Sequence, residues 1–199
     1  MEGGKLIYNG NTSCVFNPRM PCSDKDETTS GQVSKIIFHF KREKTKETFE
    51  REKRMNKLVS KIKNNKHWTM LFTSFCKTPH YNKLVDKDPD GARECFKNKP
   101  NELLEASNKY GKMLSGISGE ENLDNMFNPM FKQGGKTVDV EKNFYDLMVK
   151  LKPVFFGLTE LHKNGIIHND IKPYNIVLHD GVFKIIDYCT INEERDIGV

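Results

Sequence analysis

The sequence has no long apolar run. Its 199 residues include 30% charged side chains, and its mean hydropathy is −0.66. No stretch approaches the roughly 20 apolar residues of a membrane-spanning helix. The N-terminus has no charged-then-apolar signal pattern, and Glu2 stands where N-myristoylation requires glycine. We therefore expect a soluble protein that does not associate with a membrane and is located in the cytoplasm.

Paired cysteine motifs are also lacking. The five cysteines are odd in number and scattered, and none forms a C-x-x-C pair; they are residues 14, 22, 76, 95 and 189. This distribution predicts neither a zinc site nor a disulfide scaffold. A reducing compartment is the natural expectation for such a chain.

Internal repeats and low-complexity tracts are absent, but positive charge is concentrated in one segment. Residues 41–66 carry 11 of the 32 Lys and Arg residues and 4 of the 27 Asp and Glu residues. We interpret this segment as a solvated helix face. A patch for nucleic acid or an acidic substrate is the alternative, but Phe49 is the single aromatic residue of the segment and gives no aromatic interleaving, so nucleic acid is not an expected partner.

Local patterning predicts an α+β chain. Alternating or β-branched segments predict strands over residues 5–8, 14–17, 33–40, 68–75, 110–117, 175–178 and 182–186, the last two joined across the Asp180-Gly181 turn. Periodic apolar residues predict helices over 44–63, 101–109, 119–127 and 140–164. Pro153 should bend or interrupt the last helix. Residues 77–108 are mostly polar and, apart from the helix over 101–109, are the least informative part of the sequence.

The most informative segment lies near the C-terminus. It consists of His168-Asn169-Asp170-Ile171-Lys172-Pro173-Tyr174-Asn175, followed by Phe183-Lys184-Ile185-Ile186-Asp187-Tyr188-Cys189. Phosphoryl transfer requires a base near the attacking hydroxyl, a cation for the γ-phosphate and oxygen ligands for Mg²⁺. Asp170 fits the base, Lys172 the cation, and Asn175 with Asp187 the metal ligands. Turn formation is the alternative role for Asp170 and Asn175 taken alone.

The pattern H-x-D-x-x-x-x-N, with Lys-Pro after the Asp, resembles the catalytic loop of eukaryotic-type Ser/Thr protein kinases. The resemblance implies a protein-kinase-like fold. Residues 1–117 would form the N-terminal lobe, an antiparallel sheet with one main helix that binds the nucleotide. Residues 118–199 would form the start of a mainly helical C-terminal lobe. It also implies ATP and Mg²⁺ as cofactors and a protein substrate with a Ser or Thr hydroxyl.

The same resemblance implies a set of ATP-binding residues. Lys35 occupies the V-A-I-K position, where it would contact the α- and β-phosphates and pair with a helix glutamate. We assign that glutamate as Glu52, with Glu50 as the second choice. In the degenerate phosphate-covering loop, Gly10 permits close backbone approach and Val15 would cover the adenine. The alternative for Lys35 is an edge-strand lysine whose head reaches solvent.

A narrower resemblance concerns the run Cys14-Val15-Phe16-Asn17-Pro18, followed by Cys22. This run is similar to protein kinases encoded by large nucleocytoplasmic DNA viruses, which would place the protein in the host cytoplasm or the virion. Cys14 and Cys189 would then lie near the nucleotide. They are interpreted either as buried filler or as a redox-sensitive pair of thiols.

Three features depart from the kinase pattern. Asn169 replaces the Arg of H-R-D, so activation-loop phosphorylation is not the expected switch. Asp187-Tyr188-Cys189 replaces D-F-G, which keeps the metal ligand but loses the glycine. The sequence ends ten residues after Cys189, so apolar residues of the helix over 140–164 are expected to face solvent, or to be covered by a partner chain or by self-association.

Two other functional classes stay open. A catalytically inactive, kinase-like binding or regulatory module would explain the degenerate glycine loop, but has no need of Lys35, Asp170, Asn175 and Asp187 together. A small-molecule phosphotransferase is the third class, and Lys172-Pro173 argues against it.

Overall fold

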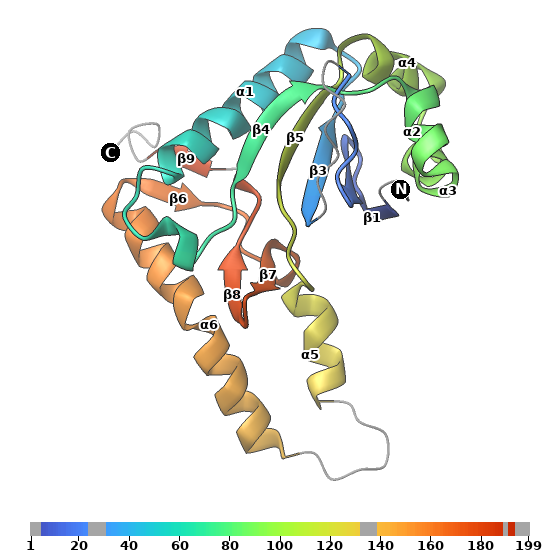
Figure 1. Ribbon diagram of the computed structural model, residues 1–199. Helices are drawn as coiled ribbons and strands as arrows, with labels where there is room; N and C mark the ends of the chain where they lie inside the picture. The colour runs from blue at the N-terminus through green and yellow to red at the C-terminus, as the bar shows by residue number, and fades with distance from the viewer. Residues whose placement is uncertain (1–4, 24–30, 132–138, 189–190, 194–199) are drawn as a thin grey trace. The chain divides into compact units, whose positions relative to one another are not determined.

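The computed structural model describes residues 5–23, 31–131, 139–188 and 191–193 (Figure 1). The chain divides into two compact units. The first unit is Met1–Arg54 with Phe72–Ser118, and the second is Met55–Leu71 with Gly119–Val199. The chain is α+β, as expected. The units differ from the predicted lobes mainly in residues 55–71, and the functional division into lobes stays a prediction.

The first unit is built on a five-stranded antiparallel sheet in the order β1-β2-β3-β5-β4. Its strands are β1 (Lys5–Asn9), β2 (Ser13–Asn17), β3 (Gln32–Ile37), β4 (Phe72–Lys77) and β5 (Lys112–Ile117). Each was expected from its local pattern, with ends shifted by a few residues. β4 begins four residues later than expected, because Thr69 instead forms an isolated bridge with Ile185.

Helices cover both faces of this sheet, as Figure 1 shows. On one face, Ile37 and Leu114 pack with Phe49 of α1 (Arg42–Val59). On the other, buried strand residues pack with α2 (Tyr81–Lys87), α3 (Pro89–Phe96) and α4 (Asn101–Tyr110); the strand residues are Cys14, Phe16, Ile36 and Met113. Since successive strand residues point to opposite faces, this alternation gives the sheet two apolar sides. The first unit is therefore three layers thick.

α2 and α3 lie in the segment before residue 101 for which the sequence pattern predicted no element. The Asp88 carboxylate accepts hydrogen bonds from the backbone N–H of Gly91 at 3.0 Å and of Leu6 at 3.1 Å. Asp at the N-cap followed by Pro89 at the first position is a favourable helix start. The turn-forming residues of this segment thus begin a helix.

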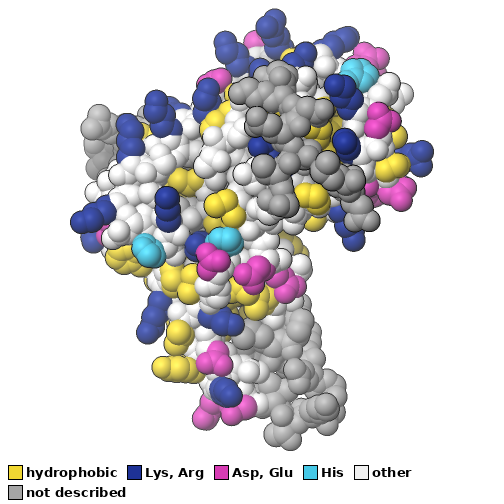
Figure 2. All heavy atoms as spheres, viewed as in Figure 1, with side chains coloured by type: hydrophobic (Ala, Val, Ile, Leu, Met, Phe, Trp, Pro, Cys, Tyr) yellow, Lys and Arg dark blue, Asp and Glu magenta, His cyan; other side chains and the backbone are white. Residues whose placement is uncertain are grey.

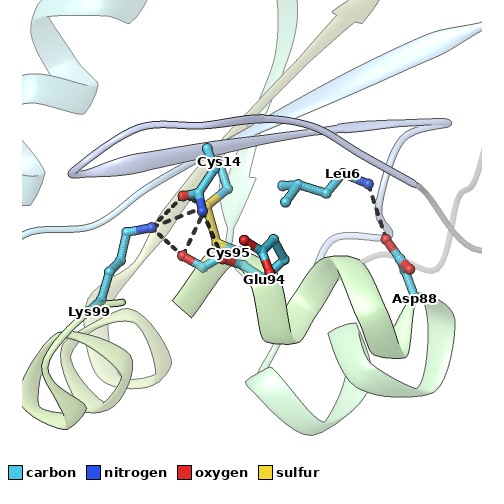
Figure 3. Close-up of a disulfide and its surroundings, with 7 residues drawn as sticks. Leu6, Cys14, Asp88, Glu94, Cys95 and Lys99 are labelled. Atoms are coloured by element: carbon cyan, nitrogen blue, oxygen red, sulfur yellow. Dashed lines mark hydrogen bonds between the residues drawn. A yellow bond between two sulfur atoms is a disulfide. The ribbon is translucent and has the colours of Figure 1, made fainter. Parts of the chain in front are cut away.

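Two disulfides are present, so the expectation of none is also wrong. Cys14 bonds to Cys95 across 81 residues of sequence, and Cys22 bonds to Cys76 across 54. Figure 3 shows the first bond joining β2 to α3. Spacing could not reveal these pairs, because tertiary packing brings their Cα atoms to 6.0 and 5.9 Å, within bonding range. The argument for a reducing compartment loses its basis.

In its described residues, the second unit contains the end of α1, two further helices and two small sheets. The two further helices are α5 (Leu123–Phe131) and α6 (Val140–Lys163), with 3₁₀ turns η1 (Asn65–His67) and η2 (Pro173–Asn175). Strands β6 (Ile166–His168) and β9 (Ile191–Glu193) pair, as do β7 (Ile176–His179) and β8 (Val182–Ile185). The β7–β8 hairpin turns at Asp180 and Gly181, which both have positive φ as a tight hairpin turn requires.

α5 begins later than the predicted helix over 119–127. Glu120 N–H donates to the Leu178 carbonyl at 2.8 Å, and Leu178 N–H donates to the Glu121 carbonyl at 2.7 Å. These bonds hold residues 120 and 121 alongside β7. The helix then starts after Asn122, whose side chain accepts from the N–H of Asn125 at 2.9 Å.

α6 contributes Leu147, Val154 and Leu161, seven residues apart, to the core of the second unit. They pack with Trp68 and Phe183, among others. The helix runs through Pro153 without the expected interruption. Proline has no N–H to donate to the carbonyl of residue 149, and Val149 lies on the exposed part of the helix, with 39% of its surface accessible.

α6 also carries exposed apolar side chains, as expected from the sequence. Phe144, Tyr145 and Phe155 are 56%, 68% and 52% exposed. Figure 2 shows hydrophobic side chains on the visible surface of this helix. Within the described ranges, no helix is long and apolar enough to cross a membrane.

Candidate active site

The loop between β6 and η2 places three of the predicted site residues together. Lys172 Nζ lies 2.7 Å from Asp170 Oδ2, and Asn175 Nδ2 donates to the same oxygen at 2.9 Å. Asn175 Nδ2 also donates to the Asp170 backbone carbonyl at 2.9 Å. The Asp170 carboxylate is therefore oriented by a cation and an amide, and its side chain is 35% exposed. It can accept a proton from a group that approaches from solvent.

Asn175 is 6% exposed and sits at the end of η2. Because its Nδ2 makes both bonds to Asp170, its Oδ1 is the atom that this side chain offers to a cation. Ile186 N–H donates to the Asn175 backbone carbonyl at 3.0 Å. That bond ties Asn175 to the residue directly before Asp187.

Asp187 follows β8 with a φ of 64°. A left-handed conformation is uncommon for a residue other than glycine and costs about 1 kcal/mol or more, so such residues concentrate at functional sites. A half-buried carboxylate in this conformation, linked through Ile186 to Asn175, fits a metal ligand. Carboxylate and amide oxygens are suitable ligands for Mg²⁺, which keeps several waters and substrate phosphate oxygens as its other ligands.

His168 connects the loop to the Asp187 turn. Asp170 N–H donates to His168 Nδ1 at 3.3 Å, so Nε2 carries the proton and donates to the Ile186 carbonyl at 3.1 Å. Burial lowers the pKa of His168, and the nearby Asp187 and Asp170 oppose this effect. The neutral imidazole therefore acts as a rigid brace between Asp170 and Ile186.

Sequence reasoning missed one supporting residue in this region. The Tyr188 hydroxyl donates to Thr69 Oγ1 at 2.6 Å, and both side chains are buried. Thr69 Oγ1 donates onward to the Ile185 carbonyl at 2.8 Å. The two partners are separated by 119 residues, so no local pattern could have indicated the contact.

The first unit holds the other predicted residues. Lys35 Nζ lies 3.1 Å from Glu52 Oε1, and the two residues are 8% and 0% exposed. Glu52 is therefore the helix glutamate that pairs with Lys35. Glu50, the second choice, is exposed and lies 4.0 Å from Lys53. β3 lies between β2 and β5, so the edge-strand interpretation of Lys35 is wrong.

Val15 is the cross-strand partner of Lys35, so their side chains share one face of the sheet. Gly10 lies in the β1–β2 turn, where its N–H donates to the Ser13 carbonyl at 2.9 Å. A Cβ added at Gly10 would come within 3.0 Å of the Tyr8 ring. The turn is compact at the point where the sequence predicts close backbone approach to a ligand.

Cys14 does not fit the interpretation as a redox-sensitive free thiol beside the nucleotide. Cys14 is disulfide-bonded and fully buried. Its side chain lies on one face of the sheet, and the side chains of Val15 and Lys35 lie on the other. Cys189 lies outside the described residues.

The predicted site residues therefore form two groups. Gly10, Val15, Lys35 and Glu52 belong to the first unit. The second unit holds the other four: Asp170, Lys172, Asn175 and Asp187. Among the described residues, no three His, Cys, Asp or Glu side chains cluster as a metal site. The oxygen pair of Asn175 and Asp187 instead suits a metal that shares its coordination with substrate.

Similarity to known proteins is partial, and no family model matches the chain. The chain is 32% identical over 94 residues to calcium-dependent protein kinase 4 of Plasmodium berghei (strain Anka), covering 44% of this chain and 16% of that protein. It is 41% identical over 46 residues to the probable serine/threonine-protein kinase irlC of Dictyostelium discoideum, covering 23% and 3%. It is 46% identical over 33 residues to the dual specificity protein kinase TTK of Mus musculus, covering 17% and 4%.

This chain thus spans 16% or less of the length of these three relatives. All three are named as protein kinases. The partial similarities support a protein-kinase-like relationship.

Proposed function

We propose that the protein is an ATP-dependent Ser/Thr protein kinase that transfers the γ-phosphate of Mg-ATP to a Ser or Thr hydroxyl of a protein substrate. The observation that carries the proposal is the loop in which Lys172 and Asn175 both contact Asp170 Oδ2, at 2.7 and 2.9 Å. A turn alone would need the asparagine or the aspartate, but not a lysine directed at the carboxylate.

In the proposed reaction, the substrate hydroxyl oxygen forms a bond to the γ-phosphorus while the bond to the β,γ-bridging oxygen breaks. The hydroxyl proton passes to the Asp170 carboxylate, and the electrons of the broken bond remain on ADP. Lys172 offsets negative charge on the transferring phosphoryl group. His168 and Asn175 hold Asp170 in position, which lowers the cost of orienting the base.

Mg²⁺, when bound between Asn175 and Asp187, would neutralise charge on the phosphates. In the first unit, Lys35 would contact the α- and β-phosphates, with Glu52 fixing its position. Gly10 would allow the loop backbone to approach the phosphates, and Val15 would cover the adenine from the same sheet face as Lys35.

The test is transfer of labelled phosphate from ATP and Mg²⁺ to a generic basic protein and to the chain itself. Asp170→Ala should reduce transfer by at least about 100-fold, as expected for loss of a general base. Asp86→Ala, which removes an exposed carboxylate on α2, is the matched control and should retain transfer. Equal transfer by both variants and the parent protein would contradict the assignment of Asp170.

A second candidate is a kinase-like module that binds nucleotide and a partner without catalysis. The exposed aromatic face of α6, with Phe144, Tyr145 and Phe155, favours it, because apolar patches of this kind mark interaction surfaces. We propose in either case that this face packs against further polypeptide, from a partner chain or a second copy. Saturable ATP binding without transfer by the folded parent protein would select the second candidate.

The similarity of the β2 segment to kinases of large DNA viruses remains a prediction, as does a cytoplasmic or virion location.

A further inference from the structure

A basic hollow of about 600 Å³ lies within the first unit, and the proposed phosphoryl transfer makes no use of it. The first turns of α1 supply Arg42, Lys46 and Glu50. The paired ends of β4 and β5 supply Lys77 and Lys112, and the last turn of α4 supplies Lys109 and Tyr110. Five cations thus face one carboxylate.

These cations come from segments far apart in the sequence. Lys46, Lys77 and Lys112 reach one hollow from three different elements. Like charges gathered around one volume repel each other, and their repulsion is relieved when an anion enters. The basic segment 41–66, which we interpreted from the sequence as a solvated helix face, contributes two of the five cations.

The position of the cations on α1 gives a second, independent indication. Arg42 is the first residue of this 18-residue helix, and Lys46 lies one turn later. The helix dipole places partial positive charge at this end, so basic side chains there are unfavourable. A bound anion reverses the sign of that interaction, because negative charge is favourable at the N-terminal end of a helix.

Three residues that line the hollow make contacts with other side chains or backbone, while three of its cations are available to bind an anion. Lys112 Nζ lies 5.6 Å from the centre of the Phe49 ring, Lys109 lies 3.6 Å from Glu105, and the Tyr110 hydroxyl donates to the Phe40 carbonyl. For Arg42, Lys46 and Lys77, the described part of the chain supplies no carboxylate within the 4.0 Å of an ion pair. Figure 2 shows Lys and Arg side chains along the upper edge of the view, near the start of α1.

We propose that this basic hollow is a binding site for a dianionic phosphate group. A phosphate monoester has three acceptor oxygens and can be met by cations from several sides at once, whereas a carboxylate offers a flat pair of oxygens. Arg42 adds a planar fork that matches two phosphate oxygens. Single-stranded nucleic acid is a poorer fit, because it requires a track of stacking aromatic rings and the hollow contains Tyr110 alone.

Two sources share this chemistry: a phosphoserine or phosphothreonine in a peptide segment, and free inorganic phosphate. The site does not depend on the proposed kinase activity, because none of its lining residues belongs to the proposed catalytic or ATP-binding set. Binding can therefore be tested without any measurement of phosphate transfer.

The experiment titrates the full-length chain with the peptide Ala-phosphoserine-Ala, with its unphosphorylated twin and with inorganic phosphate, by isothermal titration calorimetry at one fixed ionic strength. Constant ionic strength matters because exposed charges are screened by salt. The double variant Lys46→Ala/Lys77→Ala should bind the phosphopeptide about tenfold or more weakly, since two charge-assisted contacts are lost. The matched control Lys57→Ala/Lys66→Ala removes the same charge from exposed positions outside the hollow and should bind like the parent protein.

Tighter binding of the phosphopeptide than of inorganic phosphate would assign a peptide as the source, and equal affinity would assign the free ion. Either result, with the loss confined to the Lys46/Lys77 variant, supports the site. An equal loss in both double variants would show diffuse charge attraction and overturn the proposal. Equal binding of the unphosphorylated twin, or tighter binding of a short oligonucleotide, would also overturn it.

Discussion

The Tyr188 hydroxyl donates to Thr69 Oγ1 at 2.6 Å, and Thr69 donates in turn to the Ile185 carbonyl at 2.8 Å. Tyr188 stands where the kinase pattern has phenylalanine, so its hydroxyl requires a partner when buried. Thr69 provides that partner from a segment 119 residues away in sequence. Burial raises the pKa of Tyr188, which keeps the hydroxyl protonated and able to donate.

Tyr188→Phe should lower the free energy of unfolding by about 1 kcal/mol, because one buried hydrogen bond is lost while Thr69 keeps its bond to Ile185. Thr69→Val should cost more, since it also leaves the Tyr188 hydroxyl and the Ile185 carbonyl without this partner. Urea unfolding of the two single variants and the double variant measures the coupling. Strictly additive effects would show that the two side chains do not interact.

Glu52→Ala should lower the free energy of unfolding by about 3 kcal/mol, because it leaves the buried Lys35 ammonium without its carboxylate. The double variant Lys35→Met/Glu52→Leu should recover much of that loss, since it buries two apolar side chains instead. Thermal unfolding tests both. The double variant should nevertheless lose ATP binding if Lys35 contacts the phosphates; retained binding would contradict that role.

Reduction should destabilise the first unit. Loss of the Cys14–Cys95 bond frees a loop of about 80 residues, for which the chain-entropy account gives roughly 4 kcal/mol. Alkylation followed by mass spectrometry should find four more reactive cysteines after reduction than before. Cys14→Ser/Cys95→Ser should lower the unfolding temperature without reductant and should be less sensitive to added reductant than the parent protein. An unchanged alkylation count would contradict both bonds.

Stability should fall as pH drops through the His168 transition. Burial lowers the pKa of His168 in the folded state below the unfolded value of about 6.5. The unfolded state therefore binds more protons in this window, and the stability contributed by the neutral imidazole is present above pH 6.5 and is lost as pH falls through the folded-state pKa.

His168→Gln should therefore show a smaller decline in unfolding temperature between pH 7.5 and 5.0 than the parent protein. Burial also lowers the pKa of His39, so His39→Gln serves as a comparison for a histidine outside the candidate site. A decline in His168→Gln as large as in the parent protein would show that His168 does not contribute to it.

Gly157→Ala should destabilise the second unit by about 1–3 kcal/mol, although alanine favours helices. A Cβ at this position would lie 2.5 Å from Cε3 of Trp68, which is fully buried. Thr159→Ala, on an exposed position of the same helix, is the control. Trp68 is the only tryptophan in the sequence, so its fluorescence reports directly on the repacking.

Local pattern was sufficient for most elements. The period of the apolar residues predicted α1 and α6, and alternation or β-branched composition predicted the five strands of the first unit. The Asp180-Gly181 turn predicted the β7–β8 hairpin. Asp88 and Pro89 favour turns and helix starts alike, so the sequence did not indicate α3, and α6 continues through Pro153 where an interruption or a bend was predicted.

The residues of the candidate site also differ in whether the sequence alone could predict them. Residues whose roles depend on fixed spacing, such as Asp170, Lys172 and Asn175, could be grouped from the sequence because one short loop carries them. The choice of Glu52 rested on which face of α1 meets the sheet. Thr69 and the two disulfides could not be predicted, because they join segments that only the folded chain brings together.

α2, α3 and α4 leave the sheet after Lys77 and return to it at Lys112, and these two residues are direct cross-strand partners. The whole helical excursion therefore starts and ends at a single rung of the β4–β5 ladder, where a two-residue turn could close the same hairpin. The inserted segment also covers one face of the sheet, because its helices pack on Cys14, Phe16, Ile36 and Met113. The same insertion carries Cys95 into contact with β2 and brings Lys109 to the basic hollow, so covalent bracing, coverage of the sheet and the proposed anion site are linked in one insertion between two strands.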